Sequence, residues 1–162
     1  MSFGPCIPFS ALKELRRGIH EPGDVYKMAL YSPSAMLSAV TTTYSASDEV
    51  SSPGYSAGGA VIPGFVMERS NTMIHFLWPD MAWRAVTITA NGGMIYNASK
   101  GNRALAIFAF EKPISSVNGQ FCVLEWEYFV ETAYSLESLA TAANTPSINP
   151  VRRALNFLMP KN

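Results

Sequence analysis

Short apolar segments separated by turn residues recur from residue 25 to residue 130 of this chain. In the clearest segment, Val86 and Ile88 alternate with Thr87 and Thr89. Strict alternation is typical of a strand that buries one face of an antiparallel sheet. Similar segments occupy residues 25–31, 60–67, 73–78, 94–96, 103–110 and 121–126. The pattern predicts a mainly β fold, an antiparallel β-sandwich or barrel.

Glycine, proline and asparagine separate these segments. We expect turns at residues 21–24, 51–54, 91–93 and 99–102, and a further one at Asn118 and Gly119. Pro63 and Gly64 divide the segment at residues 60–67. The run at residues 103–110 is apolar at almost every position, which predicts a central strand buried on both faces.

The N-terminal part of the chain carries a helical pattern. Phe9, Leu12 and Leu15 recur at helical spacing, with Ser10 as the expected N-cap and Gly18 at the end. The pattern predicts a short helix over residues 9–17. We divide the chain into an N-terminal segment with this helix (residues 1–24), a β core (25–130) and a C-terminal arm (131–162).

The C-terminal arm is predicted to be partly helical. Asn149 and Pro150 are typical of a helix start, and an apolar stripe follows them. This segment either folds back on the sheet or docks on a neighbouring subunit. The residues expected to bind a partner are Val151, Arg152, Arg153, Leu155, Phe157 and Leu158, together with Trp126 and Tyr128.

The composition excludes several classes of function. The formal net charge is zero, which disfavours nucleic-acid binding because phosphate contacts need clustered cations. No apolar stretch reaches the roughly 18 residues of a membrane span, and no signal peptide is expected at residues 1–10, so we expect synthesis in the cytosol. Only 15% of residues are charged, a surface suited to coverage by other subunits. Cys6 and Cys122 are expected to be quiet thiols, with a disulfide between them as the alternative.

One motif resembles a catalytic site. Residues 54–58 match the Gly-x-Ser-x-Gly nucleophile elbow around Ser56. That motif needs a strand before the serine and a helix after it, whereas a turn precedes Ser56, and Pro63 and Gly64 follow. The histidine after the serine, His75, lies in an apolar strand, and the two histidines and two cysteines have no metal-ligand spacing. We therefore expect no catalytic, metal-binding or cofactor-binding residues.

Aromatic residues offer a second interpretation of the chain as a binding module. Trp78, Trp83, Trp126, Tyr128 and Phe129 could form a platform for sugars or single strands. Aromatic side chains more often fill a β core or an interface between subunits. We favour the core or interface role.

Two motifs resemble a family of small structural proteins of tailed bacteriophages. They lie in residues 26–59, which read Tyr-Lys-Met-Ala-Leu-Tyr, then Asp-Glu-Val, then Gly-Tyr-Ser-Ala-Gly-Gly, and in residues 85–97, which contain Thr-Ile-Thr-Ala and Ile-Tyr-Asn. The likeness spans roughly residues 10 to 125. It implies membership of the virion and carries over no catalytic residue.

The resemblance and the composition together lead to one expectation and two alternatives. We expect a non-enzymatic capsid decoration or cement protein on the outside of the virion, made in the bacterial cytoplasm. Its partners would be the major capsid protein and neighbouring copies of itself, without nucleic acid, membrane or cofactor. A tail or head–tail connector subunit is the first alternative. A carbohydrate- or receptor-binding module is the second.

Overall fold

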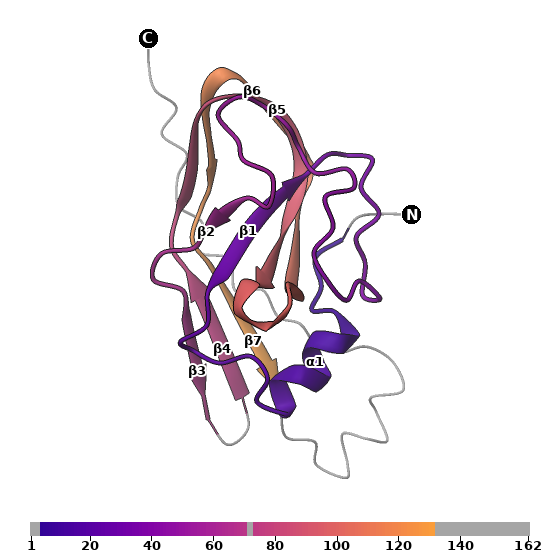
Figure 1. Cartoon of the computed structure of the whole chain (residues 1–162), viewed down its shortest axis with the longest axis vertical. Helices are drawn as coiled ribbons and strands as arrows, with labels where there is room; N and C mark the ends of the chain where they lie inside the picture. The colour runs from indigo at the N-terminus through magenta and orange to yellow at the C-terminus, as the bar shows by residue number, and fades with distance from the viewer. Residues whose placement is uncertain (1–3, 71–72, 132–162) are drawn as a thin grey trace.

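A computed structural model describes residues 4–70 and 73–131 (Figure 1). The described residues form two antiparallel sheets and one short helix, so the predicted mainly β fold is confirmed. One sheet has the strand order β2-β1-β5-β6 and the other β3-β4-β7. The elements are α1 (Phe9–Arg16), β1 (Tyr26–Tyr31), β2 (Ala60–Val61), β3 (Val66–Arg69), β4 (Met73–Trp78), β5 (Met81–Asn97), the 3-10 turn η1 (Ala98–Lys100), β6 (Arg103–Val123) and β7 (Trp126–Glu131).

One long β ribbon connects the two sheets. β5 and β6 form a hairpin through η1, and at the far end of this hairpin the pairing continues into β4 and β7. Met81 pairs with Val123 at the end of the β5–β6 ladder, and Trp78 pairs with Trp126 at the start of the β4–β7 ladder. Residues 79–80 and 124–125 separate the two ladders. There the amide of Glu125 donates to Asp80 Oδ1 at 2.6 Å. Figure 1 shows the ribbon arching over the top of the molecule, so the same two chain segments supply strands to both sheets.

The turns predicted at residues 91–93 and at Asn118 are wrong, because both sites lie inside strands. Gly93 is needed for close packing, since a Cβ there would lie 2.4 Å from Phe108 Cζ. Asn118 has a φ of 45° and its amide donates to Thr87 Oγ1, at an irregularity in the β5–β6 register. Bulges and close backbone approaches favour the same residue types as turns, so the local signal alone does not separate them.

A larger bulge bends the ribbon. Ala90 pairs with Ile114, whereas Gly92 pairs with Ala109. Between these two pairs β5 has one residue, Asn91, and β6 has residues 110–113, so the extra residues of β6 form the bulge. Pro113 lies in this bulge. Proline has no N–H, and a bulge is one of the few strand positions where no ladder bond is lost through it.

The segment predicted as a central strand, residues 103–110, is buried on both faces over most of its length, but it is not central. Residues 104–108 are fully buried, yet β6 lies at the edge of its sheet. The N-terminal segment covers that edge, because Cys6 and Ile107 exchange backbone hydrogen bonds of 2.8 and 2.9 Å. The amide of Ala104 donates to Thr42 O at 3.0 Å. The edge is thereby closed to pairing with another chain over this stretch.

A shared hydrophobic core lies between the sheets. The ring centroids of Trp78 in β4 and Phe108 in β6 are 6.2 Å apart, and Tyr26 stacks on Phe65 at 4.2 Å. Trp78 and Tyr128 are fully buried and Trp83 is nearly so. These aromatic residues fill the core, the role that we favoured from the sequence.

Helix α1 packs against this assembly through Ala11 and Leu15, which are fully buried. The helix ends as predicted: Gly18 has a φ of 70°, its amide donates to Leu15 O, and the amide of Ile19 donates to Glu14 O. The predicted N-cap is wrong, because the helix begins at Phe9 with Pro8 before it, so Ser10 lies inside the first turn.

Candidate docking surface beside the N-terminal helix

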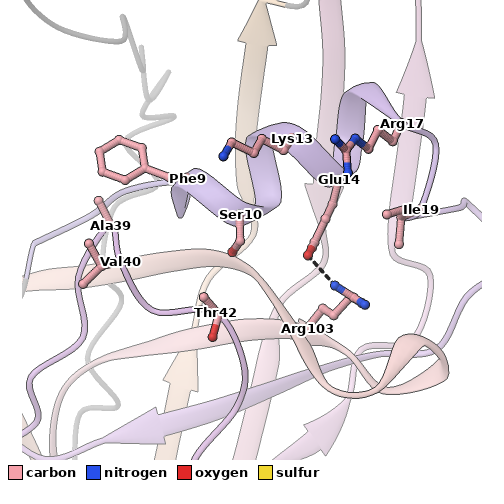
Figure 2. Close-up of a pocket in the computed structure, with 10 residues that line it drawn as sticks. All are labelled: Phe9, Ser10, Lys13, Glu14, Arg17, Ile19, Ala39, Val40, Thr42 and Arg103. Atoms are coloured by element: carbon pink, nitrogen blue, oxygen red, sulfur yellow. Dashed lines mark hydrogen bonds and ion pairs between the residues drawn. The ribbon is translucent and has the colours of Figure 1, made fainter.

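A pocket of about 460 Å³ opens beside α1, between the helix, the loop at residues 39–42 and the start of β6 (Figure 2). Ala39 O accepts a hydrogen bond of 2.8 Å from the amide of Phe9, which holds the loop against the first turn of the helix. The lining residues are Phe9, Ser10, Lys13, Glu14, Arg17, Ile19, Ala39, Val40, Thr42 and Arg103.

One end of the pocket is apolar and exposed. The side chains of Phe9, Ala39 and Val40 lie together at this end in Figure 2. Phe9 is 53% exposed and Val40 is 74% exposed. Phe9 shares the helical spacing of Leu12 and Leu15, which is typical of a core-facing stripe, but the structure places Phe9 at the surface. These side chains give the pocket an apolar rim, and a partner that covers it would gain affinity from the buried apolar surface.

The other end of the pocket is polar. Arg103 Nη1 and Glu14 Oε1 form an ion pair of 2.6 Å, drawn in Figure 2. Lys13 in α1 and Arg17 just after it are exposed, and neither forms an ion pair within the described part of the chain. The Ser10 hydroxyl is shielded from solvent and has no hydrogen-bond partner. The lining therefore carries three cations and one anion, and that anion already has a partner.

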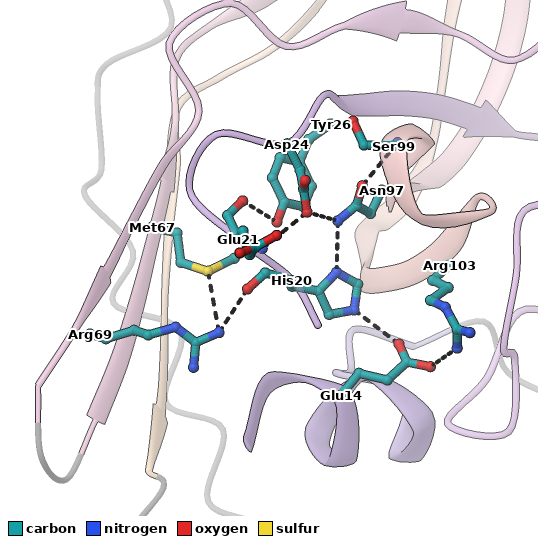
Figure 3. Close-up of polar contacts among 10 residues, drawn as sticks. All are labelled: Glu14, His20, Glu21, Asp24, Tyr26, Met67, Arg69, Asn97, Ser99 and Arg103. Carbon is teal, nitrogen blue, oxygen red and sulfur yellow. Dashed lines mark hydrogen bonds and ion pairs between the residues drawn. The ribbon is translucent and has the colours of Figure 1, made fainter. Parts of the chain in front are cut away.

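A buried histidine fixes the helix beneath the pocket (Figure 3). His20 is fully buried, with Nε2 at 2.9 Å from Glu14 Oε2 and Nδ1 at 3.2 Å from Asn97 Nδ2. The Asn97 amide nitrogen can only donate, so Nδ1 accepts and Nε2 donates to the carboxylate. Burial lowers the pKa of His20 and outweighs the opposing effect of Glu14. The imidazole is therefore neutral at pH 7 and both its nitrogens are satisfied.

Further contacts extend this cluster to both sheets. Asn97, at the end of β5, also donates through Nδ2 to Asp24 Oδ2 at 2.6 Å. Arg69 in β3 donates to Leu15 O at 2.6 Å, in the last turn of α1, where a cation is favoured. It also donates to His20 O at 2.7 Å, just after the helix. The helix is thus fixed to the four-stranded sheet through Asn97 and to the three-stranded sheet through Arg69.

A second polar cluster surrounds Glu49, in the long loop between β1 and β2. Glu49 Oε1 accepts hydrogen bonds from the Tyr55 hydroxyl (2.7 Å) and the Gly58 amide (2.9 Å). Glu49 Oε2 accepts one from the Tyr44 hydroxyl at 2.6 Å. Gly59 has a φ of 70°, and a Cβ there would lie 1.8 Å from Met28 O. The Asp-Glu-Val and Gly-Tyr-Ser-Ala-Gly-Gly segments thus hold the loop on the sheet.

The nucleophile-elbow motif lies in the same loop. Ser56 is exposed in a turn, where its carbonyl accepts a hydrogen bond of 2.9 Å from the Gly59 amide. His75, the histidine considered as its partner, lies in β4 and stacks on Phe129 at 4.5 Å. The local chain therefore lacks the strand–turn–helix geometry that exposes a catalytic serine.

Most of the residues predicted to bind a partner lie outside the described residues, namely Val151, Arg152, Arg153, Leu155, Phe157 and Leu158. Trp126 begins β7, in register with Trp78. Tyr128 is fully buried and stacks on Trp78 with ring centroids 5.7 Å apart. Its side chain fills the core and offers no surface to a partner.

The pocket beside α1 was not predicted from the sequence. It combines residues of a helix, a loop and a strand, and no local pattern predicts that Val40 and Arg103 would line the same pocket as α1. One signal was present, because a phenylalanine at the first helical position has no preceding turn to pack against. The adjacent basic residues Arg16 and Arg17 were a second signal.

The residues that the structure describes do not support a metal site, a disulfide or a membrane-spanning helix. No group of three or more His, Cys, Asp or Glu among them could hold a metal ion, and Cys6 and Cys122 are free thiols. None of the helices formed by these residues has the length and apolar character needed to cross a membrane. Comparisons of the chain with protein-family models, with curated proteins and with solved structures find no match.

Proposed function

We propose that this chain is a non-enzymatic structural protein of a bacteriophage virion, a decoration protein that binds the major capsid protein on the outside of the shell. The observation that carries the proposal is the surface beside α1, where Phe9 and Val40 are exposed next to Lys13 and Arg17. Such a combination supports protein binding, with apolar burial for affinity and charge for orientation. The family resemblance of residues 10 to 125 supports the virion as the place of that binding.

The polar clusters support a structural role over a catalytic one. His20, the buried histidine, has both ring nitrogens in hydrogen bonds that fix α1. Glu49 accepts hydrogen bonds from two tyrosine hydroxyls and a backbone amide, which hold a loop. Catalytic groups commonly face a cleft with some of their hydrogen-bonding capacity free for substrate. The groups in these clusters are instead engaged in contacts within the fold.

The carbohydrate-binding alternative loses part of its basis. Trp78 is fully buried and Trp83 is 6% exposed, so neither indole face is open to stack on a sugar ring. No described feature favours a tail or connector subunit over a decoration protein, and copy number separates the two.

The test is the copy number of this protein in purified particles, relative to the major capsid protein, by quantitative mass spectrometry. A decoration protein is expected at near-stoichiometric abundance. About a dozen copies or fewer, as cyclic symmetry gives, would assign the protein to the connector or tail instead. Complete absence from the particle would overturn the virion proposal.

The predicted C-terminal arm needs its own test. Particles would be assembled with the full chain or with a chain that ends at Glu131, the last residue of β7. If the arm docks on a neighbouring subunit, the shortened chain should be lost from the particle although it remains folded by circular dichroism. Equal incorporation of the two chains would show that the arm is not needed for binding.

A further inference from the structure

We infer that the pocket beside α1 binds an acidic peptide segment of the partner protein, with a carboxylate near Lys13 and Arg17 and an adjacent aliphatic side chain against Phe9 and Val40. This inference rests on the proposed function, because it names the chemistry of the partner at the same surface. It also makes a claim about the isolated chain that can be tested without a particle.

The charge of the pocket favours a carboxylate. Glu14, the one anion in the lining, is held by Arg103 at 2.6 Å and by His20 at 2.9 Å. Lys13 and Arg17 remain exposed, and no anion among residues 4–70 and 73–131 forms an ion pair with either. A bound carboxylate would offset part of the excess positive charge that Lys13 and Arg17 leave in the pocket.

The hydroxyls of the pocket favour an acceptor as well. Ser10 and Thr42 lie between the apolar and polar ends in Figure 2. The Ser10 hydroxyl has no hydrogen-bond partner, although it is shielded from solvent. A shielded donor without an acceptor is unfavourable, and a rotamer change would let it donate to a carboxylate oxygen seated beside the helix.

The apolar end limits what else the ligand can carry. Phe9 and Val40 are exposed within the same pocket as the cations. A free anion or a phosphate backbone would leave both side chains uncovered. A nucleic acid would also need more cations than Lys13 and Arg17 provide, since its affinity comes mostly from phosphate neutralisation. An acidic residue next to an aliphatic one satisfies both ends of the pocket.

The pocket is held in shape before binding. The contacts of His20 and Arg69 fix α1 to the sheets, and Phe9 is tied to Ala39 through a backbone hydrogen bond. A preformed site loses little conformational entropy on binding, so even a short peptide segment can bind measurably.

The experiment uses the full chain and two synthetic peptides. The acidic probe is acetyl-Gly-Leu-Asp-Glu-Val-Gly-amide, and its neutral twin replaces the two acids by Asn and Gln. Each is titrated into isotopically labelled protein at low salt while backbone amide signals are followed by nuclear magnetic resonance. We expect the acidic peptide to shift the amides of Lys13, Arg17 and Thr42 and to bind about tenfold more tightly than the neutral twin.

Matched variants assign the effect to the pocket. The double variant K13Q/R17Q should bind both peptides equally weakly. The control R84Q/K112Q removes the same charge from exposed positions of β5 and β6 and should bind like the unaltered chain. V40S should weaken both peptides by a similar factor, because it removes apolar contact without changing charge.

Several outcomes would overturn the inference. These are equal binding of the two peptides, no shift at α1, or an equal loss in both double variants. A stronger response to a ten-residue oligothymidylate would indicate a phosphate site instead. Concentration-dependent shifts of the same amides without peptide would indicate that a second copy occupies the pocket. Failure of peptide binding beside a near-stoichiometric copy number would reject this inference and leave the proposed function intact.

Discussion

Two polar clusters in the described part of the chain each fix a segment on the sheets, a buried one at α1 and a partly buried one in the loop between β1 and β2. The cluster of His20, Glu14 and Asn97 fixes α1 to the sheets, whereas the cluster of Glu49, Tyr44 and Tyr55 fixes the loop between β1 and β2. The first depends on a neutral histidine and the second on protonated tyrosines. Burial lowers the pKa of His20 and raises the pKa of Tyr55 and Tyr44. The helix and the loop should therefore be sensitive to opposite ends of the pH range.

The largest expected effect concerns the loop cluster. Gly59→Ala places a Cβ 1.8 Å from Met28 O at a φ of 70°, so the loop cannot lie on β1 without a backbone shift. We expect a loss of more than about 3 kcal/mol in the free energy of unfolding, measured by urea denaturation. The matched control is Gly64→Ala, which has a φ of 69° but open space around it and should cost about 1 kcal/mol. Equal costs would show that the contact with Met28 does not matter.

The next effect concerns the helix cluster. Glu14→Ala removes the acceptor of His20 Nε2 and the ion-pair partner of Arg103. We expect a loss of about 2 to 3 kcal/mol, because a buried donor is left without a partner. In the control Glu68→Ala, an exposed carboxylate 3.8 Å from His75 is lost, which should cost less than about 0.5 kcal/mol. A similar cost for both variants would contradict the structural role of the helix cluster.

Acid should weaken the contacts that fix α1 before it weakens those that fix the loop between β1 and β2. The folded-state pKa of His20 is lowered, so its contribution to stability is present above the unfolded value near 6.5 and is lost as the pH falls below it. Thermal unfolding between pH 7.5 and 5 should show falling stability, and His20→Gln should flatten that profile. A profile that is as steep in the variant would assign the acid sensitivity to other groups.

Alkali should give the smallest of these effects and act mainly on the loop. The raised folded-state pKa of Tyr55 means that its contribution is full below the unfolded value near 10 and is lost as the pH rises above it. Tyr55→Phe loses its hydrogen bonds to Glu49 and Leu30 at neutral pH but should lose less further stability between pH 9 and 11. Hydrogen exchange at the amides of Leu30 and Gly58 would measure the local opening.

The comparison also shows what the sequence could and could not predict. The alternation of Val86 and Ile88 predicts a half-buried strand because side-chain direction follows from position alone, and the structure confirms it. The end of α1 at Gly18 follows from local backbone geometry in the same way. Both are properties of neighbouring residues.

Features that depend on distant parts of the chain were not predictable. Gly93 resembles a turn residue until the ring of Phe108 is known to pack over it. The role of His20 has no local signal, because its contacts with Glu14 and with Asn97 exist only once α1 has packed against the β5–β6 hairpin. The pocket beside α1 is missed for the same reason, because Arg103 is far from Lys13 in the sequence.

The ribbon formed by β4, β5, β6 and β7 has a consequence for the order in which the chain can fold. Its pairing begins at the short η1 turn, where closing the first contacts costs little loop entropy. Each later pair then forms next to one already made, first through the four-stranded sheet and then into the three-stranded one. The ribbon can therefore pair by steps that each close a short loop, whereas β1 joins it across a long stretch of chain, so we expect the docking of β1 on β5 to follow the pairing of the ribbon.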